Sequence, residues 1–441
     1  MSLSPPESVR KLQRTLYAKA KEAPTYRFYA LYDKVYRPDV LAYAYRCCRA
    51  NGGAAGVDGE TFAAIESAGL ERWLVVLAVA LREKTYRPAA IRRGYTLKPD
   101  GSLRPLGILT VGDRVVQTAV RVILEPIFES DLPAEQYAYR RRRNAQQAVQ
   151  AVRALARAGH TEVVDADLSN YFGTLPHADL LKSVARRISD GAVLHLVKRW
   201  LVAPVEETDA RGRRSRTTVA KDEGRGSPQG APLSPLLANL YMRRFILAWQ
   251  QHGLQARLDA HIVSYADDLV ICCRGTGLQA YAAMQALMTR LKLTVNEAKS
   301  SLRRLPAESV DFLGYTIGRC YAPTTGRAYL GTYPSKKAVR HVCAAIGAAT
   351  QRRWLWQDAQ ALVAGLNRQM TGWANYFCLG PVSKAYRAVD AHARERLRRW
   401  LRLKHKVPSK GVARFPDQTL YQHYGLVELA PRTRNLPWAK A

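Results

Sequence analysis

Three aspartates on two strand-like segments constrain the fold of this chain more than any other feature. Residues 163–168, with the sequence VVDADL, alternate at the period of two that is typical of a strand, and Asp167 lies near its end. The segment 265–268, YADD, lies between the apolar residues 262–263 and 269–271 and predicts a hairpin with Asp267 and Asp268 at its tight turn. Because an unpaired buried carboxylate is costly, these side chains need a compensating charge.

A divalent cation or ordinary ion pairs could provide this compensation. Mg2+ is commonly held by one or two carboxylates together with substrate phosphate oxygens. Two such ions would activate a 3′-hydroxyl and stabilise a leaving pyrophosphate. Two turn aspartates and one salt-bridged strand aspartate would need no metal. The four residues of the turn, taken alone, favour the interpretation without a metal.

The positive charge of the chain indicates a polyanionic partner. The 441 residues include 68 lysines and arginines against 36 acids, a formal charge of +32, whereas 47% hydrophobic residues is an ordinary globular value. A ribosomal-type scaffold, a nucleic-acid enzyme and a nucleic-acid chaperone all fit this balance.

Other classes of protein are disfavoured by local composition. The longest apolar run, residues 73–81, is about half of what a membrane-spanning helix needs. No apolar signal-peptide core lies at the N-terminus, so we expect a cytoplasmic protein. The seven cysteines include the adjacent pairs 47–48 and 272–273, which suit neither a disulfide framework nor a zinc site. We expect them to be small buried residues in a reducing compartment.

Patterns along the chain predict helices on both sides of a group of strands. Residues 8–50 and a segment to about residue 83 read as helical around a Gly-rich loop at 51–59, and residues 95–104 read as a hairpin. Asn144 is the expected N-cap of a helix, with Gln147 completing a capping box. Residues 315–334 are expected to form a linker and residues 336–400 further helices. From 391 to 410 there are eight lysines and arginines against one acid, which predicts a basic C-terminal arm.

The order of several motifs resembles that of a known polymerase family. DLSNYF at 167–172, GSPQGAPLSPLLAN at 226–239, YADD at 265–268, Lys299 and FLGY at 312–315 resemble palm motifs A to E of reverse transcriptases, in the variant of group II intron-encoded proteins (maturases). The resemblance runs from about residue 10 to the C-terminus. It departs from the family where the usual Phe-Arg-Pro-Gly-Arg is replaced by YRRRRN at 139–144 and where the second glycine of motif B is Ala231.

The resemblance implies a right-hand polymerase of the α+β class that uses two Mg2+ ions. Asp167 and Asp267 match the metal ligands and catalytic acids, and Asp268 matches a third, more loosely engaged acid. Phe172 matches the steric gate that excludes a 2′-hydroxyl. The residues that match the family's dNTP-binding positions are Lys98, Arg104, Phe172, Gln229 and Lys299. Without the motifs, Phe172 would be interpreted as a core aromatic residue, Gln229 as part of a plain turn, and the lysines and arginine as solvated cations.

Two basic regions are expected to bind nucleic acid. At 139–144 two arginines take the place of the family's Pro-Gly turn, which adds charge where template or primer would pass, and the candidates in this segment are Arg140 and Arg143. The arm is expected to follow phosphates without reading sequence, or else to be a solvated helix face; its candidates are Arg394, Arg398, Arg399, Arg402, Lys404 and Lys406. TGWANYF at 371–377 resembles the signature of the maturase domain X, although Trp373, Tyr376 and Phe377 by themselves favour a core role.

The resemblance divides the chain into five regions. They are an N-terminal extension with the start of the fingers (1–85), fingers (86–160), palm (161–325), thumb or domain X (326–390) and a basic nucleic-acid-binding segment (391–441). No Cys-rich His-Asn-His endonuclease follows, so the chain resembles the subset without one, which needs a primer made elsewhere.

The expected function is RNA-directed DNA synthesis combined with intron RNA binding that promotes splicing and mobility. The expected partners are group II intron RNA or another RNA template, a DNA primer or target, and dNTPs, with no membrane. A splicing-only maturase and a domesticated reverse transcriptase in host defence or repair remain alternatives. The intact acids, Phe172 and Gln229 argue against the splicing-only protein.

Overall fold

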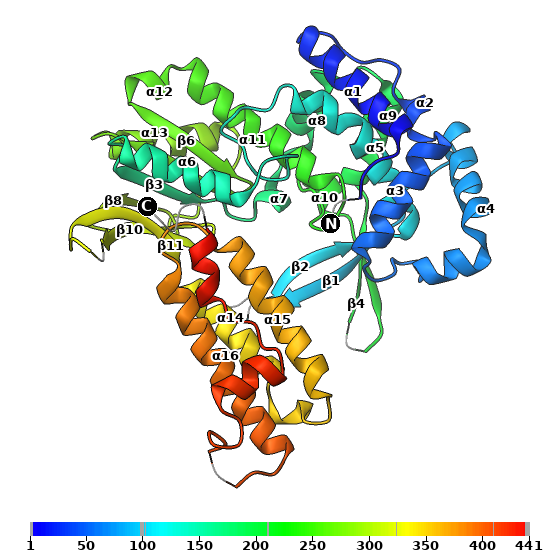
Figure 1. The fold of residues 1–441 in the computed structure, drawn as a ribbon. Coiled ribbons are helices and arrows are strands. Elements are labelled where there is room, and N and C mark those ends of the chain that lie inside the picture. The colour runs from blue at the N-terminus through cyan, green and yellow to red at the C-terminus, as the bar shows by residue number, and fades with distance from the viewer. Residues whose placement is uncertain are drawn as a thin grey trace.

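The structure is a computed structural model that describes residues 3–97, 101, 103–209, 211–322, 324–408 and 410–436. It is a mixed α+β protein in which N-terminal helices and a strand-rich middle are followed by a C-terminal helical bundle (Figure 1). Among the described residues, no helix combines the length and the apolar character needed to cross a bilayer.

The N-terminal helices pack around one buried helix, α5 (Val111–Glu129). The helices α1 (Glu7–Glu22) and α3 (Pro38–Asn51) both contact α5, and a short α2 (Tyr32–Val35) lies between them in the chain. The loop expected at 51–59 follows α3. The next helix, α4 (Phe62–Arg82), is capped by Thr61, whose hydroxyl accepts a hydrogen bond from the Ala64 amide at 3.1 Å.

A hairpin follows, as the sequence predicts. Strands β1 (Ile91–Leu97) and β2 (Leu103–Ile108) are antiparallel, with Thr96 opposite Arg104. They join β4 (Val205–Thr208) and β5 (Arg214–Thr217) in a four-stranded sheet of order β2-β1-β4-β5.

A second four-stranded sheet, of order β6-β7-β3-β8, forms the middle of the molecule and is antiparallel throughout. Its strands are β3 (Glu162–Asp167), β6 (Ala260–Tyr265), β7 (Asp268–Cys273) and β8 (Ser301–Arg304). On one face, Val164 and Ile271 belong to the core that also contains residues of α11 (Ser234–Gln251) and α13 (Gly277–Arg290). On the other face, Val163 and Val270 pack in the core that includes α6 (Ala145–Arg157).

The predicted capping box of α6 is confirmed. The Gln147 amide donates to Asn144 Oδ1 at 2.8 Å, and the Asn144 amide donates to Gln147 Oε1 at 3.1 Å. The remaining helices of this part are α7 (Tyr171–Thr174), α8 (His177–Ala185), α9 (Gly191–Leu201), α10 (Val219–Asp222) and α12 (Leu254–Arg257).

Residues 315–334 form a hairpin, so the expected linker is wrong. Strands β9 (Val310–Phe312), β10 (Tyr315–Tyr321) and β11 (Ala328–Pro334) form an antiparallel sheet of order β11-β10-β9. Gly318 faces Gly331 across the hairpin. A Cβ on Gly331 would lie 2.4 Å from Cys320 Sγ, so this glycine permits close packing within a strand and does not mark a flexible segment.

The C-terminal bundle confirms the helices expected at 336–400. It consists of α14 (Lys336–Ala349), α15 (Ala359–Tyr376) and α16 (Ser383–Lys404), with short helical turns at Arg352–Trp354, Thr419–His423 and Ala430–Asn435. Its core is separate from those of the sheets and includes Ile346, Met370 and Trp400. Helix α16 runs through residue 390, where the sequence places the start of the basic segment, so the first basic residues of that segment lie on a packed helix.

Candidate active site

The fold brings three aspartates to one end of the central sheet. Asp167 ends β3 and lies directly opposite Asp268, which begins β7. Asp267 and Ala266 form the tight turn between β6 and β7, with Ala266 in the left-handed region at φ 59°. The predicted hairpin is therefore confirmed, with Asp267 in its turn and Asp268 at the first position of the following strand. Its register places the like charges of Asp167 and Asp268 face to face, which is unfavourable without a cation.

Burial and the neighbouring carboxylates raise the pKa values of Asp267 and Asp268. The Asp268 side chain reaches solvent. Its pKa is nevertheless raised to about 7, first because the surrounding protein atoms desolvate its charge and then because Asp267, Asp167 and Asp165 are negatively charged. Burial and then the charge of Asp167 also raise the pKa of Asp267. The site thus carries negative charge that the protein does not fully compensate.

Asp165 is a fourth acid that sequence reasoning missed. Burial, followed by the charges of Asp167 and Asp311, raises its pKa to about 6. The period of two in β3 could have identified it, since residues two apart on a strand share a face and Asp165 therefore lies on the same face as Asp167.

A loop after α13 is hydrogen-bonded onto the end of β3. The Asn296 amide donates to the Asp167 carbonyl at 2.8 Å, and the Asp167 amide donates to Ser300 Oγ at 3.1 Å. This places Lys299 Nζ 3.5 Å from Asp167 Oδ2, which also accepts a long 3.4 Å hydrogen bond from Asn296 Nδ2. Because the Lys299 side chain is 68% exposed, its ion pair stabilises the fold by only about 0–1 kcal/mol, and the ammonium is free to move to another anion.

The β1–β2 hairpin is joined to the segment that contains Gln229. The Gly107 amide donates to the Gln229 carbonyl at 2.7 Å. Gly230 has φ 101°, and a Cβ there would lie 2.9 Å from the Gly107 carbonyl oxygen, so the close approach requires glycine. Arg104, exposed on β2, is near enough to the turn that its charge opposes the rise in the pKa of Asp267. Lys98 lies outside the described residues.

Phe172, five residues after Asp167, is hydrogen-bonded to the segment that contains Gln229. It is half-buried at the start of α7, and its carbonyl accepts a hydrogen bond from the Ser227 amide at 2.7 Å. The neighbouring Tyr171 is fully buried and donates from its hydroxyl to the Ala238 carbonyl at 2.7 Å. The two motif segments that the sequence singles out are thus hydrogen-bonded together beside the aspartates.

The two arginines of the 139–143 segment that were expected to contact nucleic acid lie in different environments. The Arg140 side chain is 6% exposed and pairs with Glu129 at 2.7 Å, and its Nη1 donates to the carbonyls of Pro133 and Gln136. Arg140 therefore has a structural role in place of the expected one. Arg143 is half-buried, with its guanidinium 5.1 Å from the centre of the Tyr137 ring. 

Tyr139, which sequence reasoning missed as a site residue, is 53% exposed. Burial of part of its ring raises its pKa, as does the charge of Asp267. Tyr139 and Arg142 both adopt left-handed backbone conformations, at φ 57° and 62°, in the region where the family has Pro-Gly.

The basic residues of the C-terminal region divide into two groups. Arg394 and Arg398 both pair with Asp417, and Lys404 Nζ donates to the carbonyls of Leu355 and Gln357 at 2.8 and 2.7 Å. These three therefore stabilise the bundle itself. The other three differ in their solvent exposure: Arg399 and Lys406 are exposed, and Arg402 is half-buried.

The aromatic residues near the end of α15 have the core role that their spacing favours. Phe377 is buried, with its ring centre 5.0 Å from that of Trp373. The Tyr376 hydroxyl donates to the Leu313 carbonyl at 3.0 Å, and the Tyr315 hydroxyl donates to the Tyr376 carbonyl. These contacts join the bundle to the sheet that contains β10.

The donor set at the aspartates suits a hard divalent cation. It consists of carboxylate oxygens, the kind of ligand that Mg2+ prefers. The raised pKa values of Asp267 and Asp268 show that their negative charge is not fully compensated by the protein. The nearby positive charges include Lys299 and Arg104. The aspartate oxygens are less tightly gathered than those of a closed metal site. Within the described parts of the chain, the residues whose donor atoms all lie within 4.8 Å of one another are a different group, His160, Asp259 and His261.

Comparison with known proteins agrees with this geometry. Residues 96–317 match the family of reverse transcriptases (RNA-dependent DNA polymerases), and residues 339–415 match the group II intron maturase-specific domain. The chain is 30% identical to protein YkfC of Escherichia coli (strain K12) over 367 residues, covering 75% of this chain and 93% of YkfC.

Two further relatives are matched over shorter regions. The group II intron-encoded protein LtrA of Lactococcus lactis subsp. cremoris is 30% identical over 226 residues, covering 50% of this chain and 35% of LtrA. The mitochondrial nuclear intron maturase 2 of Arabidopsis thaliana is 30% identical over 126 residues, covering 26% of this chain and 17% of that protein. The matched region thus spans nearly all of YkfC but less than half of these two. A reverse transcriptase domain followed by a maturase-specific domain places the chain in the family of group II intron reverse transcriptase/maturases.

Proposed function

We propose that the chain copies RNA into DNA at the end of the central sheet, with Asp167, Asp267 and Asp268 as the catalytic carboxylates. The observation that carries this proposal is the convergence of the three acids at one end of the sheet, inside the region that matches the reverse transcriptase family. Two of them, Asp267 and Asp268, have raised pKa values. Two Mg2+ ions held there would activate the primer 3′-hydroxyl and stabilise the leaving pyrophosphate.

Residues around the carboxylates would bind and select the incoming nucleotide. Arg104 on β2, together with Lys98, would bind the triphosphate through charge-assisted hydrogen bonds. The ring of Phe172 would lie under the sugar and exclude a 2′-hydroxyl, and the Gln229 segment would contact the nascent base pair. Lys299, exposed and next to Asp167, would transfer its contact to the phosphates and donate a proton to pyrophosphate.

The proposed architecture is that of a right hand. We assign fingers to residues 86–160 after an N-terminal extension at 1–85, palm to 161–325, thumb to 326–390 and a basic nucleic-acid-binding segment to 391–441. The β1–β2 hairpin projecting towards the helical bundle is consistent with fingers and thumb on two sides of a bound duplex (Figure 1). Within the basic segment, we retain Arg399, Arg402 and Lys406 as candidate phosphate contacts.

A second, non-catalytic activity is proposed for the same chain, namely binding group II intron RNA to promote its splicing and mobility. The maturase-specific match at 339–415 and the formal charge of +32 support it. The expected partners are this RNA or another template, a DNA primer or target, and dNTPs. We also propose a reducing, cytosolic compartment, since the adjacent cysteine pairs 47–48 and 272–273 form no disulfide.

Copying of a defined RNA of mixed sequence tests the polymerase. The wild-type chain should give DNA whose sequence is complementary to the template, and the Asp267→Ala, Asp268→Ala double variant should give none while binding the same RNA with nearly unchanged affinity. A double variant that still makes DNA would remove these residues from catalysis. If the same double variant still promotes splicing of the surrounding intron RNA, the two activities are separate. If neither the wild type nor the variant promotes splicing, the result favours the domesticated reverse transcriptase.

A further inference from the structure

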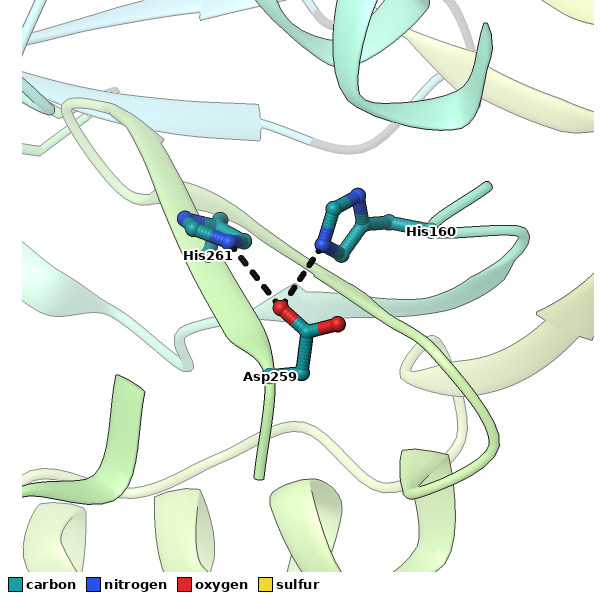
Figure 2. Close-up of side chains that lie close together, drawn as sticks. All are labelled: His160, Asp259 and His261. Carbon is teal, nitrogen blue, oxygen red and sulfur yellow. Dashed lines mark hydrogen bonds and ion pairs between the residues drawn. The ribbon is translucent and has the colours of Figure 1, made fainter. Parts of the chain in front are cut away.

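Figure 2 shows a second group of side chains that could hold a metal ion. The strand pairing places it at the opposite end of the central sheet from the aspartates. His160 precedes β3, and Asp259 and His261 lie at the start of β6. One donor atom from each residue lies within 4.8 Å of those of the other two. Asp167 is at the far end of β3, about 20 Å away at roughly 3.3 Å per residue of extended strand, so this group is distinct from the proposed catalytic site.

His160 is held in an orientation that suits a metal ligand. Its side chain is 9% exposed, and its Nδ1 lies 3.2 Å from the Leu155 carbonyl oxygen, where it donates a hydrogen bond. Its Nε2 is directed at Asp259 Oδ1, 2.9 Å away. A backbone carbonyl that accepts from the other ring nitrogen is the usual arrangement that orients a metal-binding histidine.

Both histidines converge on one carboxylate oxygen. His261 Nε2 lies 3.4 Å from Asp259 Oδ1, and the two imidazole rings meet edge to face with centres 4.6 Å apart. Arg274 Nε lies 3.6 Å from the other oxygen, Oδ2, so Oδ1 is the atom that faces both rings. With Nδ1 of His160 donating to Leu155, Nε2 meets the carboxylate favourably in two ways, either as a protonated ring that donates to Oδ1 or through a cation held between the two groups.

The group is accessible to an ion and to a water ligand. The Asp259 and His261 side chains are 47% and 31% exposed. Asp259 itself adopts a left-handed conformation, with φ 42°, which is uncommon for a residue other than glycine and turns the chain into β6.

We propose that His160, Asp259 and His261 bind a divalent transition-metal ion, for which Zn2+ is the best fit, independently of any Mg2+ at the aspartates. Two imidazole nitrogens and one carboxylate oxygen form a borderline donor set that Zn2+ prefers, whereas Mg2+ prefers oxygen alone. Water would complete a tetrahedral site. The ion would join the turn after α6 to the start of β6, segments 99 residues apart in the chain, and would therefore stabilise the folded state.

The test is zinc binding by the full chain, stripped of metal and kept in excess Mg2+. Isothermal titration and thermal unfolding should give one Zn2+ per chain and a higher unfolding midpoint in the wild type. His261→Asn and Asp259→Asn should each weaken binding by at least about tenfold and abolish the rise in midpoint. His341→Asn, which changes an exposed histidine on α14, and Asp267→Asn should bind as the wild type does.

A spectroscopic readout separates this site from adventitious binding. Co2+ in place of Zn2+ should give the visible absorption of tetrahedral nitrogen and oxygen coordination in the wild type, and His261→Asn should remove it. Zinc affinity that is unchanged in both His261→Asn and Asp259→Asn, or no zinc binding by the wild type in excess Mg2+, would overturn the proposal.

Discussion

Replacing Asp165 with asparagine should stabilise the metal-free protein at neutral and alkaline pH. Burial and the charges of Asp167 and Asp311 raise the pKa of Asp165 from its ordinary 3.8 to about 6. At about 1.4 kcal/mol for each factor of ten in the ionisation constant, the ionised form therefore costs the folded state at most about 3 kcal/mol. Asparagine has nearly the same shape and no charge, so Asp165→Asn removes this cost.

The sign of the pH dependence follows from the same pKa. Between pH 3.8 and about 6 the folded wild type holds a proton on Asp165 that the unfolded chain has released, so its stability falls as pH rises through this range. The gain from Asp165→Asn should thus be largest above pH 6 and vanish near pH 3.8. The raised pKa of Asp268, about 7, should fall as well, because one of the charges that raise it has been removed.

Urea unfolding in EDTA at several pH values measures this prediction. Asp33→Asn is the matched control, since its parent carboxylate is 58% exposed on α2 and pairs with Lys34. We expect Asp165→Asn to raise the free energy of unfolding at pH 8 by up to about 3 kcal/mol and the control to change it little. Equal stability of wild type and Asp165→Asn at pH 8, or a loss at every pH, would refute the electrostatic interpretation of this end of the sheet.

Three further predictions address selection, packing and nucleic-acid binding. Phe172→Ala should raise ribonucleotide incorporation relative to dNTPs in primer extension; an unchanged ratio would remove it from the gate role. Gly230→Ala should lower the unfolding free energy by about 1–3 kcal/mol, measured by urea, because φ 101° and the nearby Gly107 carbonyl oppose a Cβ; normal stability would show that the loop relaxes. Arg399→Ala should reduce the salt dependence of RNA affinity at constant thermal midpoint, whereas Arg398→Ala, which breaks a pair with Asp417, should lower the midpoint; equal effects would contradict their division into two groups.

The elements that could be predicted are those with a local signal. The period of two at 163–168 and the apolar residues around the 265–268 turn predict β3 and the β6–β7 hairpin, and the Asn144–Gln147 pair predicts the start of α6. The hairpin of β10 and β11 was missed because Gly318 and Gly331 look like linker residues. Their reason for being glycine is a contact across strands, which becomes visible only once the register is known.

The candidate site was predictable to the same extent. Motif order identifies the three aspartates, but the register that places Asp167 opposite Asp268 comes from tertiary pairing. Arg140 could not be assigned correctly from the sequence, because a run of arginines predicts a charged surface. The structure instead surrounds its guanidinium with Glu129 and two backbone carbonyls. The His160–Asp259–His261 group could not be assembled from the sequence, because His160 lies 99 residues before Asp259 in the chain.

Primer extension on a poly(rA)/oligo(dT) duplex with dTTP and Mg2+ tests the central claim most directly. The wild type and the surface control Asp33→Ala should extend the primer, and Asp267→Ala should not, although all three bind the duplex with similar affinity. This result would place RNA-templated DNA synthesis at the turn between β6 and β7. Extension by Asp267→Ala at the wild-type rate, or no extension by the wild type despite tight RNA binding, would contradict the account and favour a splicing-only maturase.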